Sequence, residues 1–312
     1  MPTDGSFARG AACALALLVW TTAAWADDAD GPKKISFRFA PPDGTELVQT
    51  LRTTRENELE GLGRQADQHA AETEITYRHS EDGTVMTSKL LSIETTRNGK
   101  QVKDPVSELL KATVITYRID GDGQVEEITG FGSLVTMVEE AFPPEVAKVL
   151  APMLDEQAVV AREKAEWNST VGDFAGADVA IGDVLETEVP FTLPDGESLV
   201  YFARTSFPRM EACPAGSCVR VEVLYDSDAA ALDRLATRAA AGIAAAASDE
   251  AVAVSPSGIR LSGSTTRLID PSTMLIYEET RERTTKMSVE VPGRGSIPST
   301  MKETRRYTFS YR

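Results

Sequence analysis

Few residues of this chain have the types and spacing that catalysis or metal binding requires. Its 312 residues include 3 cysteines and 2 histidines. His69 and His79 show no paired spacing with each other or with the cysteines, as a metal site would need. The motifs H-E-x-x-H and G-x-S-x-G and the P-loop do not occur. The sequence therefore predicts no catalytic residue, no metal site and no cofactor, and we expect the chain not to be an enzyme.

Acidic residues are the remaining source of chemistry. The run Asp120-Gly121-Asp122-Gly123 begins like a calcium loop, but Val125 and Phe131 stand where an EF-hand needs glycine and glutamate. A hairpin turn is the better interpretation. Acidic pairs are expected in a chain with 48 acidic and 32 basic residues. An enzyme therefore stays an alternative only if Asp and Glu side chains converge in a cleft with shifted pKa values.

The charge balance limits the partners. A formal net charge of −16 argues against nucleic acid or an anionic membrane surface as the main partner. No protein partner is indicated by the sequence.

Cys213 and Cys218 lie in the run Cys-Pro-Ala-Gly-Ser-Cys, between two strand-like segments. Pro214 and Gly216 are turn residues, so the cysteines are placed on either side of a hairpin tip. A metal site would need two more ligands, and a redox-active pair is more typically spaced C-x-x-C. The sequence predicts a structural disulfide, formed in an oxidising compartment.

The N-terminus has the pattern of an export signal. Arg9 precedes an apolar run from Ala11 to Trp20, and Ala24-Trp25-Ala26 is an A-x-A site that predicts cleavage after Ala26. The run is shorter than the roughly 20 residues of a membrane span. Cys13 precedes most of the run instead of following it, so lipidation is not expected. We expect a soluble, exported protein without a membrane span, in the periplasm or outside the cell.

Period-two alternation and tight turns predict strands on both sides of a central helical stretch. Asp82-Gly83 and Asn98-Gly99 are hairpin turn signals. About eleven or twelve strands are expected, mainly antiparallel. The polar segment Glu56 to Gln68, with two glycines, is predicted to be a loose loop. Short Thr-Thr-Arg echoes, such as Thr265-Thr266-Arg267, are predicted to lie on the solvated face of the sheet.

The central stretch, residues 131–167, carries apolar residues at helical spacing. Pro143 and Pro144 divide it into two helices. Their apolar faces are expected to cover the sheet, and the alternative is a lid over a ligand cavity. In that alternative, the candidate apolar ligand lining consists of Phe131, Leu134, Val138, Phe142, Val149 and Met153.

The predicted fold class is α+β. It consists of a large curved, mainly antiparallel β-sheet, like a half-barrel, covered by the two central helices and one later Ala-rich helix. Ser227 is the expected cap of that last helix. The predicted domains are a signal peptide, residues 1–26, and a single α+β domain, residues 27–312. Two β-rich halves, 34–171 and 182–312, are the alternative.

Two runs read strand, turn, strand: Tyr117-Arg-Ile-Asp-Gly-Asp-Gly-Gln-Val before the helices and Leu268-Ile-Asp-Pro-Ser-Thr-Met-Leu-Ile-Tyr near the end. With the export signal and the mid-chain helices, this layout resembles bacterial envelope half-barrels of the LolA/LolB/LppX type and other exported bacterial proteins of unknown function. The resemblance implies an apolar cavity between sheet and helices, suited to acyl chains. The leading hypothesis is an exported, periplasmic, non-enzymatic protein that binds a lipid or other hydrophobic ligand. A structural or interaction protein of the envelope with a filled core is the alternative.

Overall fold

The computed structural model describes residues 33–312, apart from 62, 103–109, 112, 143, 145–154, 193–197, 231, 235–254 and 292–294. Residues 32–312 form one compact unit. The predicted export signal, with its cleavage after Ala26, lies outside the described residues.

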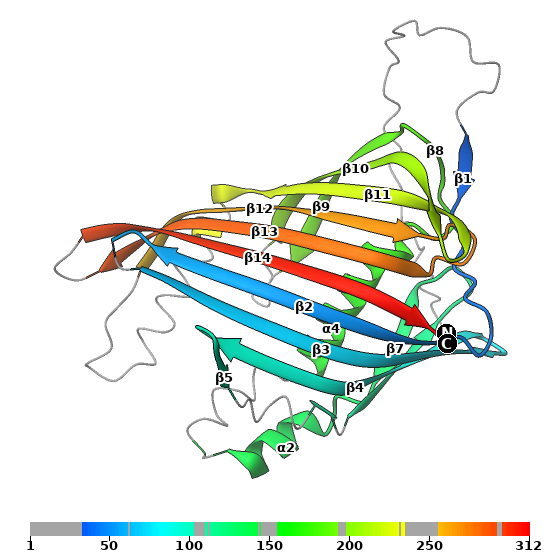
Figure 1. Ribbon diagram of the computed structural model, residues 1–312, viewed down its shortest axis with the longest axis horizontal. Coiled ribbons are helices and arrows are strands. Elements are labelled where there is room, and N and C mark those ends of the chain that lie inside the picture. Colours follow the sequence, from blue (N-terminus) through cyan, green and yellow to red (C-terminus); the bar gives the residue numbers. More distant parts are fainter. Residues whose placement is uncertain are drawn as a thin grey trace, which may run out of the picture. The chain divides into compact units, whose positions relative to one another are not determined.

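The main layer is a 12-stranded antiparallel sheet (Figure 1). The order of its strands is β7-β6-β4-β3-β2-β14-β13-β12-β11-β10-β9, and β5 pairs with β4 beside this path. Their bounds are β2 (Glu46–Leu59), β3 (Gly63–Ser80), β4 (Gly83–Arg97), β5 (Lys100–Val102), β6 (Val114–Ile119), β7 (Val125–Thr129), β9 (Val184–Thr192), β10 (Ser198–Cys213), β11 (Gly216–Ser227), β12 (Ser255–Ile269), β13 (Ile276–Val291) and β14 (Gly295–Tyr311). A second, two-stranded sheet pairs β1 (Lys34–Ser36) with β8 (Asp178–Ala180).

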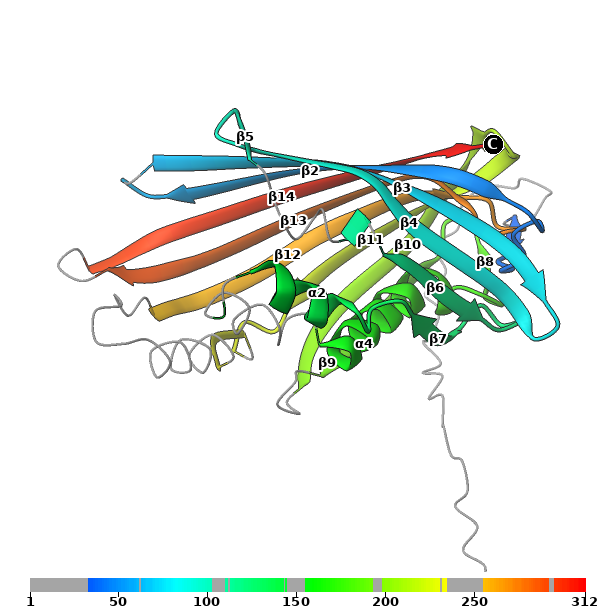
Figure 2. The ribbon, with the colours of Figure 1, turned by 90° about the horizontal axis from the view of Figure 1, so that it is seen from below.

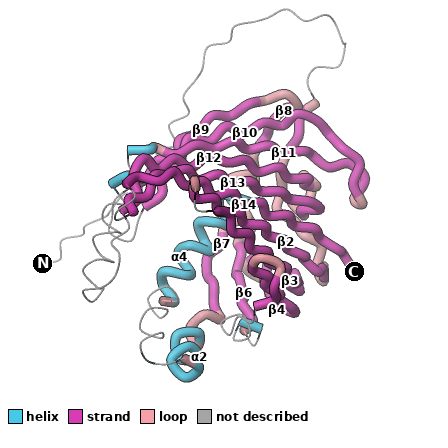
Figure 3. The backbone as a smooth tube through the Cα atoms, turned by 60° about the vertical axis from the view of Figure 1, so that its left-hand side comes forward, coloured by secondary structure: helices cyan, strands magenta, loops and turns pink. Residues whose placement is uncertain are grey.

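The sheet is curved, and its first and last strands in this order, β7 and β9, are not paired with each other in the part that the structure describes (Figures 1 and 3). Its centre is β14, which pairs with β13 on one side and β2 on the other. Strands from before and after the helical stretch therefore share one sheet.

Tight turns set the registers of the long hairpins. Asn98 and Gly99 both have positive φ, 48° and 76°, as a two-residue hairpin turn with matching twist requires. Gly83, at φ 142°, is the first residue of β4, the strand that pairs with β6. A Cβ at this position would lie 2.2 Å from the carbonyl oxygen of Ile119, so only glycine fits there without a shift of backbone.

The predicted loop from Glu56 to Gln68 is wrong, because β2 continues to Leu59 and β3 begins at Gly63. The two strands pair in register up to this short turn. Their inward side chains here are polar and charged, so the alternation of apolar and polar residues that marks a half-buried strand is missing.

The described helices lie on the concave side of the sheet (Figures 2 and 3). They are α2 (Leu134–Ala141) and α4 (Glu156–Trp167), and α4 continues into a short π-helix, η2 (Asn168–Gly172). The second half of the predicted central pair, around residues 146–154, lies outside the described residues. Most of the predicted Ala-rich helix, from residue 235 onward, lies outside them as well.

Two groups of buried side chains hold these elements together. The first core cluster joins Leu134 of α2 and Val159 of α4 to strands at one side of the sheet, through Leu47, Tyr77 and Tyr117. The second core cluster joins β1, β8 and the segment after α4 to β10, β11 and β12. Its largest members, Phe37 and Phe207, are fully buried, with ring centroids 5.9 Å apart. Partly buried Phe39 and Trp167 pack against both clusters. At these rings, α4 is fixed between the two clusters.

Candidate functional site

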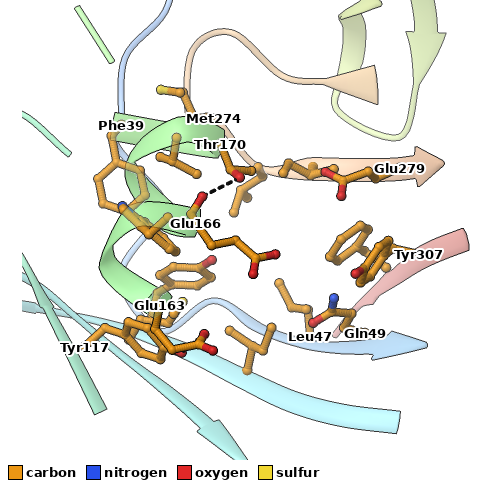
Figure 4. A pocket seen from close by; sticks show the side chains of 18 of the residues that line it. Phe39, Leu47, Gln49, Tyr117, Glu163, Glu166, Thr170, Met274, Glu279 and Tyr307 are labelled. Atoms are coloured by element: carbon orange, nitrogen blue, oxygen red, sulfur yellow. Dashed lines mark hydrogen bonds between the residues drawn. The ribbon is translucent and has the colours of Figure 1, made fainter. Parts of the chain in front are cut away.

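The concave face of the sheet holds two cavities. The narrow cavity, of about 190 Å³, lies between α4 and strands of the first core cluster, and its walls include Leu47, Tyr117, Trp167 and Tyr307 (Figure 4). The wide cavity, of about 690 Å³, lies over β9 to β13. Only the wide cavity falls in the range of roughly 300–1,000 Å³ that is usual for small-molecule sites.

The space in the wide cavity follows from the side chains across one row of the sheet. Arg283, Gly263, Tyr225, Ala203 and Thr187 face one another in register on five neighbouring strands. The Tyr225 side chain fills the place of a side chain at Gly263, so the small side chain that leaves room in this row is Ala203. The larger apolar side chains of the lining are Phe174, Val179, Leu185, Phe207, Val223 and Leu261. Polar and charged side chains, among them Thr205, Thr265 and Arg267, line the cavity as well.

A buried network of ion pairs divides the two cavities, because Thr170 and Arg281 line both of them. Arg281 donates from Nη1 to Oε1 of Glu166 at 2.6 Å and from Nε to Glu279. Arg267 donates from Nε to Oε2 of Glu279 at 2.5 Å and from Nη2 to Oγ1 of Thr170 at 3.4 Å. The end of α4 and the turn after it are thus bonded to β13 through Arg281 and to β12 through Arg267, between the two cavities.

Glu279 stays ionised in this network. Burial alone would raise the pKa of its carboxyl, but the guanidiniums of Arg267 and Arg281 outweigh burial and hold the pKa below its ordinary value. Arg281 also lies over the ring of Tyr307, 5.2 Å from its centroid.

Glu163 is the acid of the narrow cavity that behaves differently. Figure 4 shows its side chain beside Tyr117, whose hydroxyl donates to Oε2 of Glu163 at 3.4 Å. Burial raises the pKa of this carboxyl, and the negative charge of Glu166 raises it further. The same burial raises the pKa of the Tyr117 hydroxyl.

A row of alternating charges crosses the concave face beyond the narrow cavity. Arg97, Asp67, Arg55, Glu303 and Arg283 lie opposite one another on β4, β3, β2, β14 and β13. The shortest nitrogen–oxygen distances are 3.3 Å for Arg97–Asp67, 2.5 Å for Arg55–Glu303 and 3.2 Å for Arg283–Glu303. Opposite charges at directly facing positions stabilise the pairing of neighbouring strands.

The Glu303 carboxylate at the centre of this row also accepts a hydrogen bond from Nε of Arg305 at 2.9 Å. Burial raises the pKa of Glu303, but the hydrogen bond from Arg55 and the charges of Arg305 and Arg283 outweigh it, so the pKa lies below its ordinary value.

The Thr-Thr-Arg echoes lie differently from the prediction. Arg55, Arg97 and Arg267 all belong to the ion pairs of the concave face, and Arg267 is only 6% exposed. For Arg267 the prediction of a solvated position is wrong, because the acidic partner Glu279 on the neighbouring strand allows its guanidinium to be buried. Arg55 and Arg97 are 42% and 58% exposed.

The residues that the sequence predicts as an apolar ligand lining lie elsewhere in the structure. Phe131 and Leu134 are buried in the first core cluster, and Val138 is only 1% exposed. Phe142 is half-buried at the end of α2. None of these four residues lines the narrow or the wide cavity. Val149 and Met153 lie outside the described residues, so a role of this set in ligand binding stays a prediction.

The residues that sequence reasoning missed carry a recognisable signal. Glu279, Arg281 and Arg283 alternate along β13, and Glu303 and Arg305 do so along β14. Charges at every second position of a strand place all of them on one face. Opposite charges on adjacent strands at this spacing indicate a charged interior.

The predicted disulfide between Cys213 and Cys218 is confirmed, at the tip of the β10–β11 hairpin with a Cα–Cα distance of 5.8 Å. The histidines have ordinary partners: His69 Nδ1 lies 2.8 Å from Thr95 Oγ1, and His79 Nε2 lies 2.9 Å from the Pro41 carbonyl oxygen. Within the described ranges, no group of three His, Cys, Asp or Glu side chains is placed to hold a metal ion. None of the helices described is long and apolar enough to cross a membrane.

Comparison with known proteins assigns no family, since no family model and no curated sequence matches the chain. Among solved structures, lipovitellin, studied for its lipid–protein interactions, is similar with a TM-score of 0.42 and 9% identity, over 86% of this chain and 25% of that one. This chain therefore spans about a quarter of the length of lipovitellin.

Two bacterial structures are similar at lower scores. A putative exported protein with a YmcC-like fold from Bacteroides fragilis has a TM-score of 0.20 and 9% identity, over 86% of this chain and 97% of that one. A LolA superfamily protein from Nitrosomonas europaea has a TM-score of 0.17 and 8% identity, over 88% of this chain and 86% of that one.

Proposed function

We propose that this chain is an exported, non-enzymatic protein that binds a hydrophobic ligand in the wide cavity, on the concave face of its sheet. The observation that carries the proposal is a space of about 690 Å³ whose walls include the apolar side chains of Phe174, Phe207 and Val223. Protein interiors are otherwise packed nearly without voids, so a space of this size suits an occupant.

The energetics favour a chain-like occupant. Each buried methylene contributes about 0.8 kcal/mol, so roughly eight methylenes contribute about 6 kcal/mol before ordering costs are subtracted. Dissociation constants of tens of micromolar or weaker are therefore the expected range. The wall of the cavity that follows α4 includes Thr170, which accepts a hydrogen bond from Arg267, and the ion pair of Glu166 with Arg281 ties the adjoining end of α4 to the sheet.

The two alternatives are less well supported. A structural protein with a filled core would leave no cavity, although Phe202 and Leu224 are 52% and 56% exposed and could serve as contacts. For an enzyme, carboxylates do converge at the narrow cavity, but Glu166 and Glu279 are both bonded to Arg281. Glu163 alone does not supply the paired acid and base that most hydrolytic mechanisms use.

Dye displacement and native mass spectrometry test the proposal. Wild-type protein should bind a polarity-sensitive naphthylamine dye, and dodecanol should displace it. Protein from its own host should carry an added lipid mass that is lost on denaturation.

Filling the cavity supplies the structural control. Ala203→Phe, which points a ring into the wide cavity, should weaken dye binding by roughly tenfold or more. Leu224→Phe on the exposed outer face should leave it unchanged. Thr187→Phe, on the neighbouring strand, is a second filling variant in case the first unfolds. Absence of dye binding and of added mass, or equal binding by all variants, would contradict the proposal.

A further inference from the structure

The ion pairs of the concave face contain more arginines than glutamates. Three glutamates accept all the ion pairs of five arginines there. The glutamates are Glu166, Glu279 and Glu303, and the arginines are Arg55, Arg267, Arg281, Arg283 and Arg305. Five arginines against three glutamates leave two formal positive charges within these ion pairs, inside a chain whose net charge is −16. Glu163, a further acid of the narrow cavity, is in none of them. A local excess of the sign opposite to that of the whole chain points to an anionic ligand.

Arg283 is the arginine where this excess meets the wide cavity. It lines the cavity, and among the described residues its ion pair is the one from Nη2 to Oε1 of Glu303, at 3.2 Å. Its Nε is buried and has no hydrogen-bond partner in the part of the chain that the structure describes. A buried donor without an acceptor costs about 1–3 kcal/mol, so nearly all such groups in proteins are paired. Nε itself is closed to the cavity, but the side chain as a whole is 35% exposed, so a ligand oxygen can approach its guanidinium.

The acidic residues that line the same cavity do not neutralise Arg283. They are Asp173 and Glu188, and both are exposed, so water screens their charges. Glu188 also alternates along β9 with Leu185 and Thr187, which places its side chain on the other side of the strand.

We infer that the ligand of the wide cavity is an amphiphile with one anionic head, a carboxylate or a phosphate, bound by Arg283. The inference rests on the proposed function. The apolar chain lies against Phe207, Val223 and Leu261, and the head lies at the row of Arg283, Gly263 and Tyr225. Arginine suits both heads, because its planar guanidinium presents several donors to two oxygens at once.

Isothermal titration of the full chain with a matched series tests this. Dodecanoate, dodecyl phosphate and dodecanol share one chain and differ in the head, while acetate and inorganic phosphate supply the head alone. We expect dodecanoate and dodecyl phosphate to bind roughly tenfold or more tightly than dodecanol. Acetate and phosphate should not bind in the same concentration range, which distinguishes a lipid-like ligand from a free anion.

Two variants localise the effect. Arg283→Met should reduce the affinity for dodecanoate to that for dodecanol and leave dodecanol binding unchanged, which also shows that the cavity is intact. Arg306→Met removes an exposed arginine on the opposite face of β14 and should change neither affinity.

Each outcome decides between the two proposals. If dodecanol binds as tightly as dodecanoate, or Arg283→Met binds dodecanoate like the wild type, the anionic head is wrong and the hydrophobic site stands. If acetate or inorganic phosphate binds as tightly as its dodecyl counterpart, the ligand is a small anion and the amphiphile is wrong. If no chain-bearing probe binds, the proposed function fails as well.

Discussion

Arg55 on β2 and Glu303 on β14 lie directly opposite each other, and Nε and Nη2 of Arg55 both donate to Oε2 of Glu303, at 2.9 and 2.5 Å. The two residues are 248 positions apart in the chain. Arg283 and Arg305 share the other oxygen of the same carboxylate. One side chain thus joins three strands at the middle of the sheet.

Glu303→Gln should therefore destabilise the fold. The change leaves three guanidiniums around a neutral amide, and breaking a buried ion pair typically costs about 3–5 kcal/mol. Because Arg55 is 42% exposed, we expect about 2 kcal/mol, measured by urea unfolding at pH 7. Glu282→Gln, at an exposed position of β13, is the control and should change the free energy of unfolding little.

The stability difference between the wild type and Glu303→Gln should depend on pH, because the Glu303 carboxyl titrates. The folded-state pKa of Glu303 lies below its unfolded value, so its contribution is present above the unfolded pKa and is lost as pH falls through the folded one. The stability difference between the wild type and Glu303→Gln should shrink as the pH is lowered from 5 towards 2. A difference that stays constant over this range would contradict the assignment.

Glu163→Gln should affect stability in the opposite direction to Glu303→Gln. The pKa of Glu163 is raised in the fold, so the folded state binds its proton more tightly and loses stability as pH rises from the unfolded to the folded pKa. An uncharged amide removes this penalty and can still accept from Tyr117. Thermal unfolding should show a higher Tm for the variant at pH 8 and no advantage near pH 3. A lower Tm at pH 8 would mean that the charge is stabilising.

Replacing Cys213 and Cys218 together by alanine should lower stability by about 2 kcal/mol or less, since the disulfide closes a loop over a sequence separation of only 5. Circular dichroism should show an unchanged sheet. The control is the oxidised wild type against the wild type in reductant, which should differ by a similar amount.

Gly83→Ala should be among the costly single substitutions of the turns. The new methyl would lie 2.2 Å from the Ile119 carbonyl oxygen, which belongs to the β6 backbone and cannot move without breaking the pairing with β4. A loss of roughly 2 kcal/mol or more is expected. At Gly121, a Cβ meets nothing within 4 Å, and Gly121→Ala should stay within about 0.5 kcal/mol of the wild type.

The parts of the fold that the sequence predicts are those where turn chemistry or alternation is local. Asn98-Gly99 and Asp82-Gly83 mark their hairpins, and Cys213 and Cys218 mark theirs. The sequence fails between Glu56 and Gln68, because strands with charged inner faces have no apolar alternation. Their partners, such as Glu303 for Arg55, come from the far end of the chain.

The candidate site could not be predicted for a related reason. The wide cavity lies where Ala203 falls in one row with Arg283, and that row depends on the registers of several hairpins. Composition and periodicity within one strand do not specify which small residues meet across strands. The helical stretch around Phe131 is the candidate ligand lining that the sequence offers, because its apolar face follows from the spacing of residues within one segment.

The central position of β14 has a consequence for the order of folding. β14 follows every other strand of the sheet in the chain, yet both β2 and β13 pair with it. Until residues 295–311 have been synthesised, these two strands present long unpaired edges, which are prone to pair with other molecules. Pairing across such long sequence separations also makes folding slow. The two halves of the sheet cannot join during synthesis, so we expect this chain to depend on chaperones, or on a late, concerted folding step.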